Sequence, residues 1–308
     1  MKQIGKISAM TLGTVQLGMN YGIANDAGKP DEAKSFAILR SALENGVTVL
    51  DTARGYGDSE DVIGRFLKQW EGEMPFICTK ILHVPDERAD DIENYVVESV
   101  ETSLKSLGVN KVGAVMLHFA PDVAQYGQRL ADAMGKLIEL GYTDQVGVSV
   151  YDNAQIEEML KYDIYTVTQV PMSIFDQRLI ANGAVKKLQE RGVTVFVRSV
   201  FLQGLFFLDP DKITDPILVE HAAPKIRLLR HIAEEEGMNV AQRAIAFMRD
   251  CAGITSLVLG ADTPDQVKSN IAYFEVPQLK ESTMATLQRE FANVDIPAIM
   301  QVLSRPKN

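Results

Sequence analysis

Short runs of apolar, often β-branched residues alternate with longer amphipathic segments along the whole chain. After an opening run at Met10–Leu17, strand-like runs follow at Val47–Asp51, Phe76–Lys80, Val112–His118, Gln145–Val150, Thr166–Val170, Val193–Arg198 and Ser256–Gly260. Several of these runs are apolar on both faces, which is typical of parallel strands that are covered on each side. The pattern therefore predicts a parallel sheet with helices packed around it.

The amphipathic segments between the strand-like runs predict the helices. They lie at Glu32–Glu44, Glu60–Lys68, Asp91–Leu107, Val123–Leu140, Ala154–Lys161, Ile180–Glu190, Pro224–Glu235, Val240–Asp250 and Pro264–Tyr273. Gly46, Gly108, Gly141 and Gly192 stand where left-handed caps would end four of them. About eight strand–helix units, with no linker rich in Pro, Gly or Ser, favour one closed barrel over a two-domain doubly wound sheet. We expect an α/β fold, a (β/α)8 TIM barrel forming a single domain over residues 1–308.

The composition indicates which partners and which cellular location to expect. The 308 residues are 46% hydrophobic and 23% charged, with a formal net charge of -10, which is ordinary for a globular protein. An acidic chain repels phosphate backbones and anionic lipid, so neither nucleic acid nor a membrane is an expected partner. Cys78 and Cys251 match neither a disulfide framework nor a zinc pattern. The first residues lack the apolar core of a signal peptide, so we expect a cytoplasmic protein.

Polar groups end three neighbouring strands, where a barrel carries its chemistry. Asp51 ends the second strand and Tyr56 follows it, Lys80 ends the third, and His118 ends the fourth. Each has an ordinary structural explanation alone, but together they suit carbonyl reduction, in which the oxygen gains charge and needs a proton donor. An ammonium beside the phenol makes it a better donor, and a carboxylate paired with Lys80 would hold that ammonium in place.

The run Asp51-Thr-Ala-Arg-Gly-Tyr56-Gly-Asp-Ser-Glu60-Asp-Val-Ile-Gly64 resembles the signature of the aldo-keto reductase superfamily. The similarity extends from Leu12 to Asn270. It implies a catalytic tetrad of Asp51, Tyr56, Lys80 and His118, with Tyr56 as general acid–base, in a metal-free oxidoreductase that reduces an aldehyde, ketone or sugar. It also implies a nicotinamide cofactor across the barrel mouth, bound without a GxGxxG motif.

The same resemblance implies the cofactor contacts. Ser149 and Gln169 match residues that bind the nicotinamide amide, although Val150 replaces the usual Asn. The loop after the seventh strand resembles the pyrophosphate loop, with Arg198, Ser199, Leu202 and Gly204. The loop after the eighth strand resembles the one that holds the adenosine end, with Gly260, Ala261, Asp262, Thr263, Gln266 and Asn270.

Two further residues depart from the family pattern. Arg198 stands where many relatives place an aromatic ring against the nicotinamide, and a guanidinium there would stack or reach an anionic group. Asp262 stands where relatives often offer a hydroxyl or a basic residue to the ribose 2′-phosphate. A carboxylate would repel that phosphate and would suit the 2′-hydroxyl of NAD(H) instead. The family's habit nevertheless puts NADP(H) first, with NAD(H) as the alternative.

The substrate is expected to be a small carbonyl compound or sugar. Candidate walls of its pocket are Met19–Ile23, His83, Phe119, Ile174–Arg178, Phe206–Phe207 and the C-terminal tail from about residue 277, and Arg54 or Arg178 could meet an acidic sugar. Two other functions stay open. One is a Schiff-base lyase or aldolase that uses Lys80, and the other is a cofactor-binding regulatory subunit. No heptad pattern specifies an oligomeric state.

Overall fold

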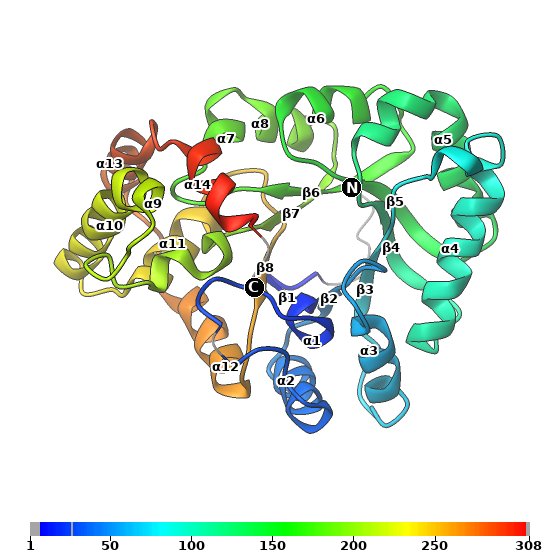
Figure 1. The fold of residues 1–308 in the computed structure, drawn as a ribbon, viewed down its shortest axis with the longest axis horizontal. Helices are drawn as coiled ribbons and strands as arrows, with labels where there is room; N and C mark the ends of the chain where they lie inside the picture. Colours follow the sequence, from blue (N-terminus) through cyan, green and yellow to red (C-terminus); the bar gives the residue numbers. More distant parts are fainter. Residues whose placement is uncertain (1–6, 26, 306–308) are drawn as a thin grey trace.

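A closed barrel of parallel strands forms the centre of the computed structural model, which describes residues 7–25 and 27–305 (Figure 1). Each strand pairs with its neighbours in the sequence, and the last closes against the first. The strands are β1 (Met10–Gly13), β2 (Val49–Asp51), β3 (Phe76–Ile81), β4 (Val112–Leu117), β5 (Thr143–Ser149), β6 (Tyr165–Pro171), β7 (Thr194–Arg198) and β8 (Ser256–Gly260). The predicted (β/α)8 barrel is confirmed.

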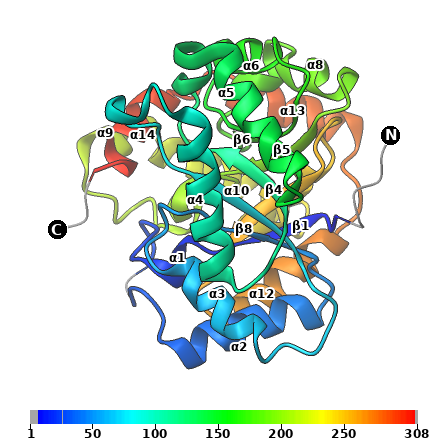
Figure 2. The same cartoon turned by 90° about the vertical axis from the view of Figure 1, so that its right-hand side faces the viewer.

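Helices surround this barrel, as the view turned by 90° also shows (Figure 2). Those that correspond to the predicted helices are α2 (Glu32–Glu44), α3 (Ser59–Leu67), α4 (Ile92–Leu107), α5 (Pro121–Glu139), α6 (Asn153–Met159), α7 (Arg178–Ala181), α8 (Ala184–Glu190), α10 (Ala223–Glu235), α11 (Val240–Arg249) and α12 (Pro264–Ala272). Further short elements are α1 (Val15–Gly18), η1 (Asp86–Arg88), η2 (Leu202–Phe207), α9 (Pro216–His221), η3 (Tyr273–Glu275), α13 (Glu281–Phe291) and α14 (Ile296–Leu303). In the described ranges no helix is long and apolar enough to cross a membrane.

The structure differs from the predicted elements in several places, among them the opening strand-like run Met10–Leu17, in which β1 ends at Gly13 and helix α1 begins at Val15. The helix expected over Ile180–Glu190 is split into α7 and α8, because Gly183 adopts a φ of +79° between them. The helices α9, α13 and α14 were not predicted, since they lie outside the repeated strand–helix pattern. The four predicted glycine caps are confirmed, because Gly46, Gly108, Gly141 and Gly192 all have positive φ.

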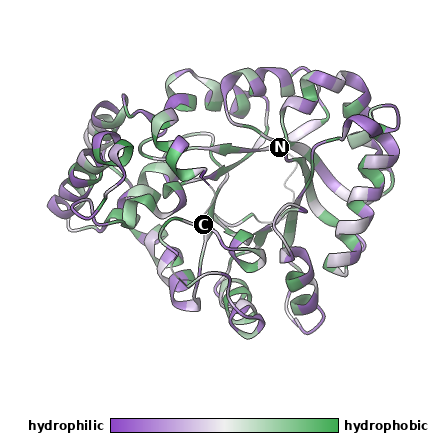
Figure 3. Ribbon diagram, in the orientation of Figure 1, coloured by the Kyte–Doolittle hydropathy of each residue, from purple (hydrophilic) through white to green (hydrophobic). Residues whose placement is uncertain are grey.

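Two apolar layers hold the barrel together. The larger one lies between the strands and the helices, and the smaller one fills the barrel with side chains from the strands, namely Val49, Cys78, Ala114, Met116, Val167 and Phe196. Figure 3 shows hydrophobic colour along the strands, while the surrounding helices carry both hydrophilic and hydrophobic colour, as expected of amphipathic helices. The inner layer matters for function because alternate residues of a strand face the same way. It therefore fixes which side chains point into the barrel at the carboxyl end of each strand.

Candidate active site

Strand periodicity directs polar side chains to one end of the barrel. Asp51, Lys80 and His118 each follow an inner-layer residue by two positions, after Val49, Cys78 and Met116. By the same count Gln169 follows Val167, and Arg198 follows Phe196. Because side chains two positions apart lie on one face of a strand, these groups share the axis of the barrel above its apolar filling. The predicted chemistry-bearing residues are thus brought together.

A buried ion pair lies at the base of this group. The Nζ of Lys80 lies 2.6 Å from the Oδ1 of Asp51, and both side chains are almost fully buried. The same Nζ donates to the carbonyl oxygen of Thr52 at 3.0 Å. The Nε2 of Gln169 donates to the Oδ1 of Asp51 at 2.8 Å. Because buried charges are costly unless paired and hydrogen-bonded, this network holds the ammonium in one place.

Tyr56 lies next to the ammonium. Its hydroxyl is 3.4 Å from the Nζ of Lys80, and its ring forms an edge-on contact with the ring of His118 at 5.6 Å between centroids. The turn that carries Tyr56 packs directly on Gly18, where a Cβ would come within 1.7 Å of the Tyr56 carbonyl oxygen. Only glycine allows that approach, so α1 helps to set the position of the phenol.

Burial and the Lys80 charge set the protonation states. Burial raises the pKa of the Tyr56 phenol, and Lys80 opposes that rise without cancelling it. For Lys80, burial would lower the pKa, but the neighbouring Asp51 charge raises it above its ordinary range. Burial, followed by the charge of Lys80, lowers the pKa of His118 to about 4. Near neutral pH the site therefore holds a protonated phenol, an ammonium and a neutral imidazole.

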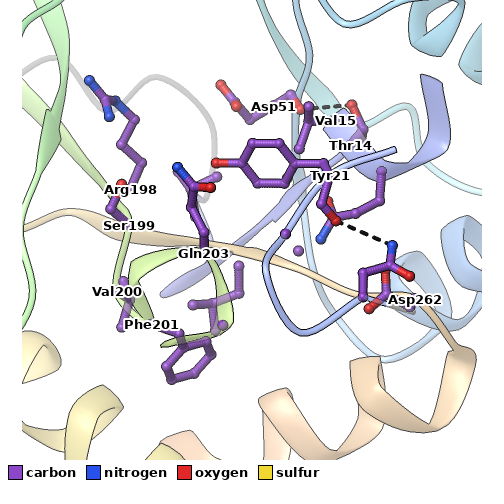
Figure 4. A pocket seen from close by; sticks show the side chains of 18 of the residues that line it. Thr14, Val15, Tyr21, Asp51, Arg198, Ser199, Val200, Phe201, Gln203 and Asp262 are labelled. Atoms are coloured by element: carbon purple, nitrogen blue, oxygen red, sulfur yellow. Dashed lines mark hydrogen bonds between the residues drawn. The ribbon is translucent and has the colours of Figure 1, made fainter. Parts of the chain in front are cut away.

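A cleft of about 730 Å³ opens above these groups. Asp51, Tyr56 and His118 line it, while Lys80 lies beneath its surface. Nine of the predicted cofactor residues also line the cleft: Ser149, Gln169, Arg198, Ser199, Gly204, Gly260, Asp262, Gln266 and Asn270. Figure 4 shows a view into this cleft, with Arg198 and Ser199 on one side and Asp262 on the other.

Three predicted cofactor residues do not line the cleft. Leu202 and Ala261 are buried. Thr263 caps helix α12, where its side chain accepts a hydrogen bond from the backbone N–H of Gln266 at 3.1 Å. These side chains are therefore used for packing and capping, and any contact that they make with a ligand has to come from their backbone.

The loop after β7 has an unusual backbone. Ser199, Leu202 and Gln203 have φ values of +64°, +47° and +57°, and Gly204 has +95°. Left-handed conformations in non-glycine residues cost about 1–3 kcal/mol each and gather at functional sites. Left-handed residues among right-handed ones turn backbone N–H groups toward a common side and create anion-binding concavities. The predicted pyrophosphate loop thus has a backbone suited to that role.

The loop between β1 and α2 also borders the cleft. Its Ile23 N–H donates to the carbonyl oxygen of Gln203 at 2.8 Å, and its Asn25 side chain donates to the Oδ1 of Asp262 at 3.2 Å. Tyr21 from this loop lines the cleft, and burial raises its pKa to about 12. Tyr21 belongs to a predicted wall segment, but the two cross-links were not predicted because they join residues far apart in sequence.

The other predicted pocket walls divide into two groups. Phe207 lines the cleft, as do Met300 and Ser304 from the C-terminal tail. The other predicted residues are not among the lining residues, namely Arg54, His83, Phe119, Phe206 and the segment Ile174–Arg178. Four further residues line the cleft without having been predicted from the sequence, namely Gln16, Asn25, Tyr151 and Gln203. Their only sequence signal is their location in loops that follow barrel strands.

Comparison with known proteins gives the class of this barrel. The family model of the aldo/keto reductase family matches residues 9–290. The chain belongs to the aldo/keto reductase family.

Individual relatives are distant but match along nearly their whole length. The chain is 23% identical to the L-glyceraldehyde 3-phosphate reductase of Escherichia coli K12, covering 94% of this chain and 89% of that protein. It is 26% identical to the NADH-specific methylglyoxal reductase of the same strain, covering 93% and 95%. A solved structure of an aldo/keto reductase from Klebsiella pneumoniae in complex with NADP and acetate superimposes with a TM-score of 0.71, at 20% identity and 92% coverage of each chain. That structural similarity supports the fold assignment.

Proposed function

We propose that this protein is an oxidoreductase that interconverts a small carbonyl compound and its alcohol with a nicotinamide cofactor. The observation that carries the proposal is the position of the Tyr56 hydroxyl, which lies 3.4 Å from the Lys80 ammonium. Buried Asp51 holds that ammonium, and Tyr56 lines a large cleft. Family membership supports the same reaction type. The nicotinamide cofactor, when bound, supplies the hydride for reduction.

The residues of the site divide the remaining chemistry between them. As the carbonyl carbon accepts the hydride, its oxygen gains negative charge and takes the proton of the Tyr56 hydroxyl. The Lys80 ammonium stabilises the phenolate that remains, because it lies within hydrogen-bond distance in a buried site. His118 is neutral and therefore orients the substrate oxygen by a hydrogen bond rather than by delivering a proton. Solvent then returns a proton to Tyr56.

Features of the cleft fit a dinucleotide. Its volume of about 730 Å³ is in the range of small-molecule sites. The Oε1 atom of Gln16 is buried without a hydrogen-bond partner in the described part of the chain, and Gln16 lines the cleft beside Gly260. An orphaned polar atom of this kind is expected where a ligand completes the site. Ser149 and Gln169 would hold the nicotinamide amide, and the loop Ser199–Gly204 would hold the pyrophosphate.

The choice between NADP(H) and NAD(H) depends on Asp262. The family resemblance favours NADP(H), and the Klebsiella relative was solved with NADP. The charges of this cleft favour NAD(H), because Asp262 lines the end assigned to the adenosine and no Lys or Arg of the described chain lines that end. A carboxylate repels a 2′-phosphate and accepts a hydrogen bond from a 2′-hydroxyl. We expect NADH to bind at least as tightly as NADPH.

The Schiff-base alternative needs a neutral amine that is open to substrate. Lys80 is fully buried, does not line the cleft, and is held in its charged form by Asp51. These features favour a positioning ammonium over a nucleophile. Borohydride added to a mixture of protein and carbonyl substrate tests this point. We expect no covalent adduct on Lys80, and a trapped adduct there would contradict the proposed reaction.

The direct test of the proposed function is a fluorescence titration of the purified protein with NADPH and, separately, NADH. Saturable binding of either nucleotide, followed by its oxidation when a panel of aldehydes and ketones is added, is the expected result. Failure of both nucleotides to bind would contradict the oxidoreductase assignment.

A further inference from the structure

Arg198 is the one cationic side chain of Lys or Arg type among the described residues that line the cleft. The nearby Lys80 lies below the surface and its charge is balanced by Asp51. The chain as a whole carries a net charge of -10. Overall charge balance does not explain a positive charge in the candidate active-site cleft of an acidic protein. An anionic ligand would explain it.

No described carboxylate pairs with the Arg198 guanidinium. Its Nη2 donates to the carbonyl oxygen of Val150 at 3.3 Å, and its central carbon lies 4.3 Å from the centre of the Tyr151 ring. No acidic side chain in the described ranges forms a salt bridge with it. The stacked ring and the carbonyl group hold the guanidinium plane without neutralising it, because neither partner carries a negative charge.

The two arginines that the sequence offered for an acidic substrate, Arg54 and Arg178, are already paired. Arg54 forms a salt bridge with Glu60 at 2.7 Å, and Arg178 forms one with Asp176 at 2.8 Å. Both carboxylates are almost fully buried. Their charges are therefore used within the protein, and Arg198 remains as the candidate for an external anion.

Arg198 also lies at the reacting end of the cleft. It ends β7 on the inner face of the barrel, and its charge contributes to the electrostatics of Tyr21, Tyr56 and His118. Asp262 lies on the opposite side in Figure 4, and the ring of Tyr21 extends between the two with its hydroxyl toward the Arg198 side. The cleft is thus positive near the phenol and negative at its far end.

We propose that Arg198 binds an anionic group of the substrate, so that this protein acts on carbonyl compounds that carry a carboxylate or a phosphate. This inference rests on the proposed function and adds the class of substrate to it. A planar guanidinium presents paired N–H donors that match the two oxygens of such a group. The Tyr21 hydroxyl, which stays protonated because burial raises its pKa to about 12, is a second donor on the same side.

The test compares neutral and anionic substrates of matched size. Glyceraldehyde is compared with glyceraldehyde 3-phosphate, and butanal with 4-oxobutanoate, for the wild type and for Arg198→Gln. We expect the wild type to prefer the anionic member of at least one pair, which also distinguishes phosphate from carboxylate. In Arg198→Gln, kcat/KM for that member falls about 10- to 100-fold more than kcat/KM for the neutral member. Because Arg198 is also a predicted cofactor residue, any loss of nucleotide affinity acts on both members alike, and the ratio of the two kcat/KM values is the quantity that tests the anion site.

Two further variants act as controls. Arg198→Lys keeps the charge but loses the paired donors, so we expect its kcat/KM for the anionic substrate to lie between those of the wild type and Arg198→Gln. Arg191→Gln removes one positive charge from an exposed ion pair with Asp163, and we expect no change of substrate preference. The proposal would be overturned if Arg198→Gln lowered kcat/KM equally for neutral and anionic substrates. It would also be overturned if the variant bound the nucleotide more weakly but kept the wild-type preference for the anionic substrate.

A binding measurement separates this inference from the proposed reaction. Calorimetric titration with glycerol 3-phosphate and with glycerol requires no turnover. Tighter binding of the phosphate that is lost in Arg198→Gln supports the anion site even if no carbonyl is reduced. If the wild type turns over neutral carbonyls but does not bind glycerol 3-phosphate better than glycerol and prefers neither anionic substrate in turnover, the anion site is wrong and the oxidoreductase assignment stands.

Discussion

Replacing Lys80 by Met tests how much the buried ion pair between Lys80 and Asp51 contributes to the stability of the folded protein. The substitution removes the ammonium but leaves the Asp51 carboxylate almost fully buried, with the Gln169 amide still donating to it at 2.8 Å. Breaking a buried pair by removing one partner costs about 3–5 kcal/mol. Because the Gln169 amide still donates a hydrogen bond to the carboxylate, we expect a loss of unfolding free energy at the lower end of this range, about 3 kcal/mol.

That free energy converts into a measurable change of melting temperature. With about 2.1 cal/mol/K of unfolding entropy per residue, 308 residues give about 0.65 kcal/mol/K. A loss of about 3 kcal/mol therefore lowers the Tm by about 5 °C. Denaturant titrations followed by circular dichroism measure the loss in free energy directly, and thermal scans give the Tm.

The double variant Lys80→Met/Asp51→Asn isolates the interaction between the two groups. Removing both charges leaves no uncompensated ion, so we expect its loss to be smaller than the sum of the single losses by at least about 2 kcal/mol. The matched control is Lys111→Met, which breaks an exposed pair with Asp144 and should cost less than about 1 kcal/mol. Additive effects of Lys80→Met and Asp51→Asn would show that the two charges do not stabilise each other in the folded protein.

Two further predictions concern pH and the cofactor. The folded-state pKa of His118, about 4, lies below its ordinary value of 6.5, so the unfolded chain binds the extra proton between these pH values. The contribution of neutral His118 to the free energy of unfolding is therefore fully present above about pH 6.5. It is lost as the pH drops toward 4, by at most about 3 kcal/mol. Denaturation of His118→Gln at pH 4.5 and 7.5 should show a smaller difference than the wild type, and an unchanged difference would refute this assignment. Asp262→Ser removes the carboxylate that we propose lies beside the 2′-phosphate. The Kd of NADPH should therefore fall roughly tenfold relative to the Kd of NADH. A ratio that does not change in nucleotide titrations would place the 2′-phosphate away from Asp262.

Much of the site could be predicted because strand periodicity and strand ends are local properties. Asp51, Lys80 and His118 end apolar strands, and a parallel barrel brings such ends together whatever the details of the loops. The conformation of the loops could not be predicted in this way. The left-handed backbone at Leu202 and Gln203 is supported by the loop that follows β1, a contact over about 180 positions.

The pairing of the arginines and the protonation of Tyr56 could not be predicted from the sequence either. The sequence offers Arg54 and Arg178 for an acidic sugar and Arg198 as a cofactor residue. Only the fold shows that Arg54 and Arg178 are paired with buried carboxylates. The balance at Tyr56 is similar, because Lys80 lowers its pKa as the sequence suggests while burial raises it by more. Burial of a loop residue depends on the elements packed against it, and the sequence does not specify them.

The central claim is that Tyr56 donates the proton while the cleft binds a reduced nucleotide. Its most direct test is a comparison of wild type and Tyr56→Phe, in which the Kd of the nucleotide and the rate of its oxidation by one carbonyl substrate are measured on the same samples. We predict a rate reduced by about 10²–10⁴-fold with a Kd that changes less than about threefold. A variant that keeps its full rate would contradict the account.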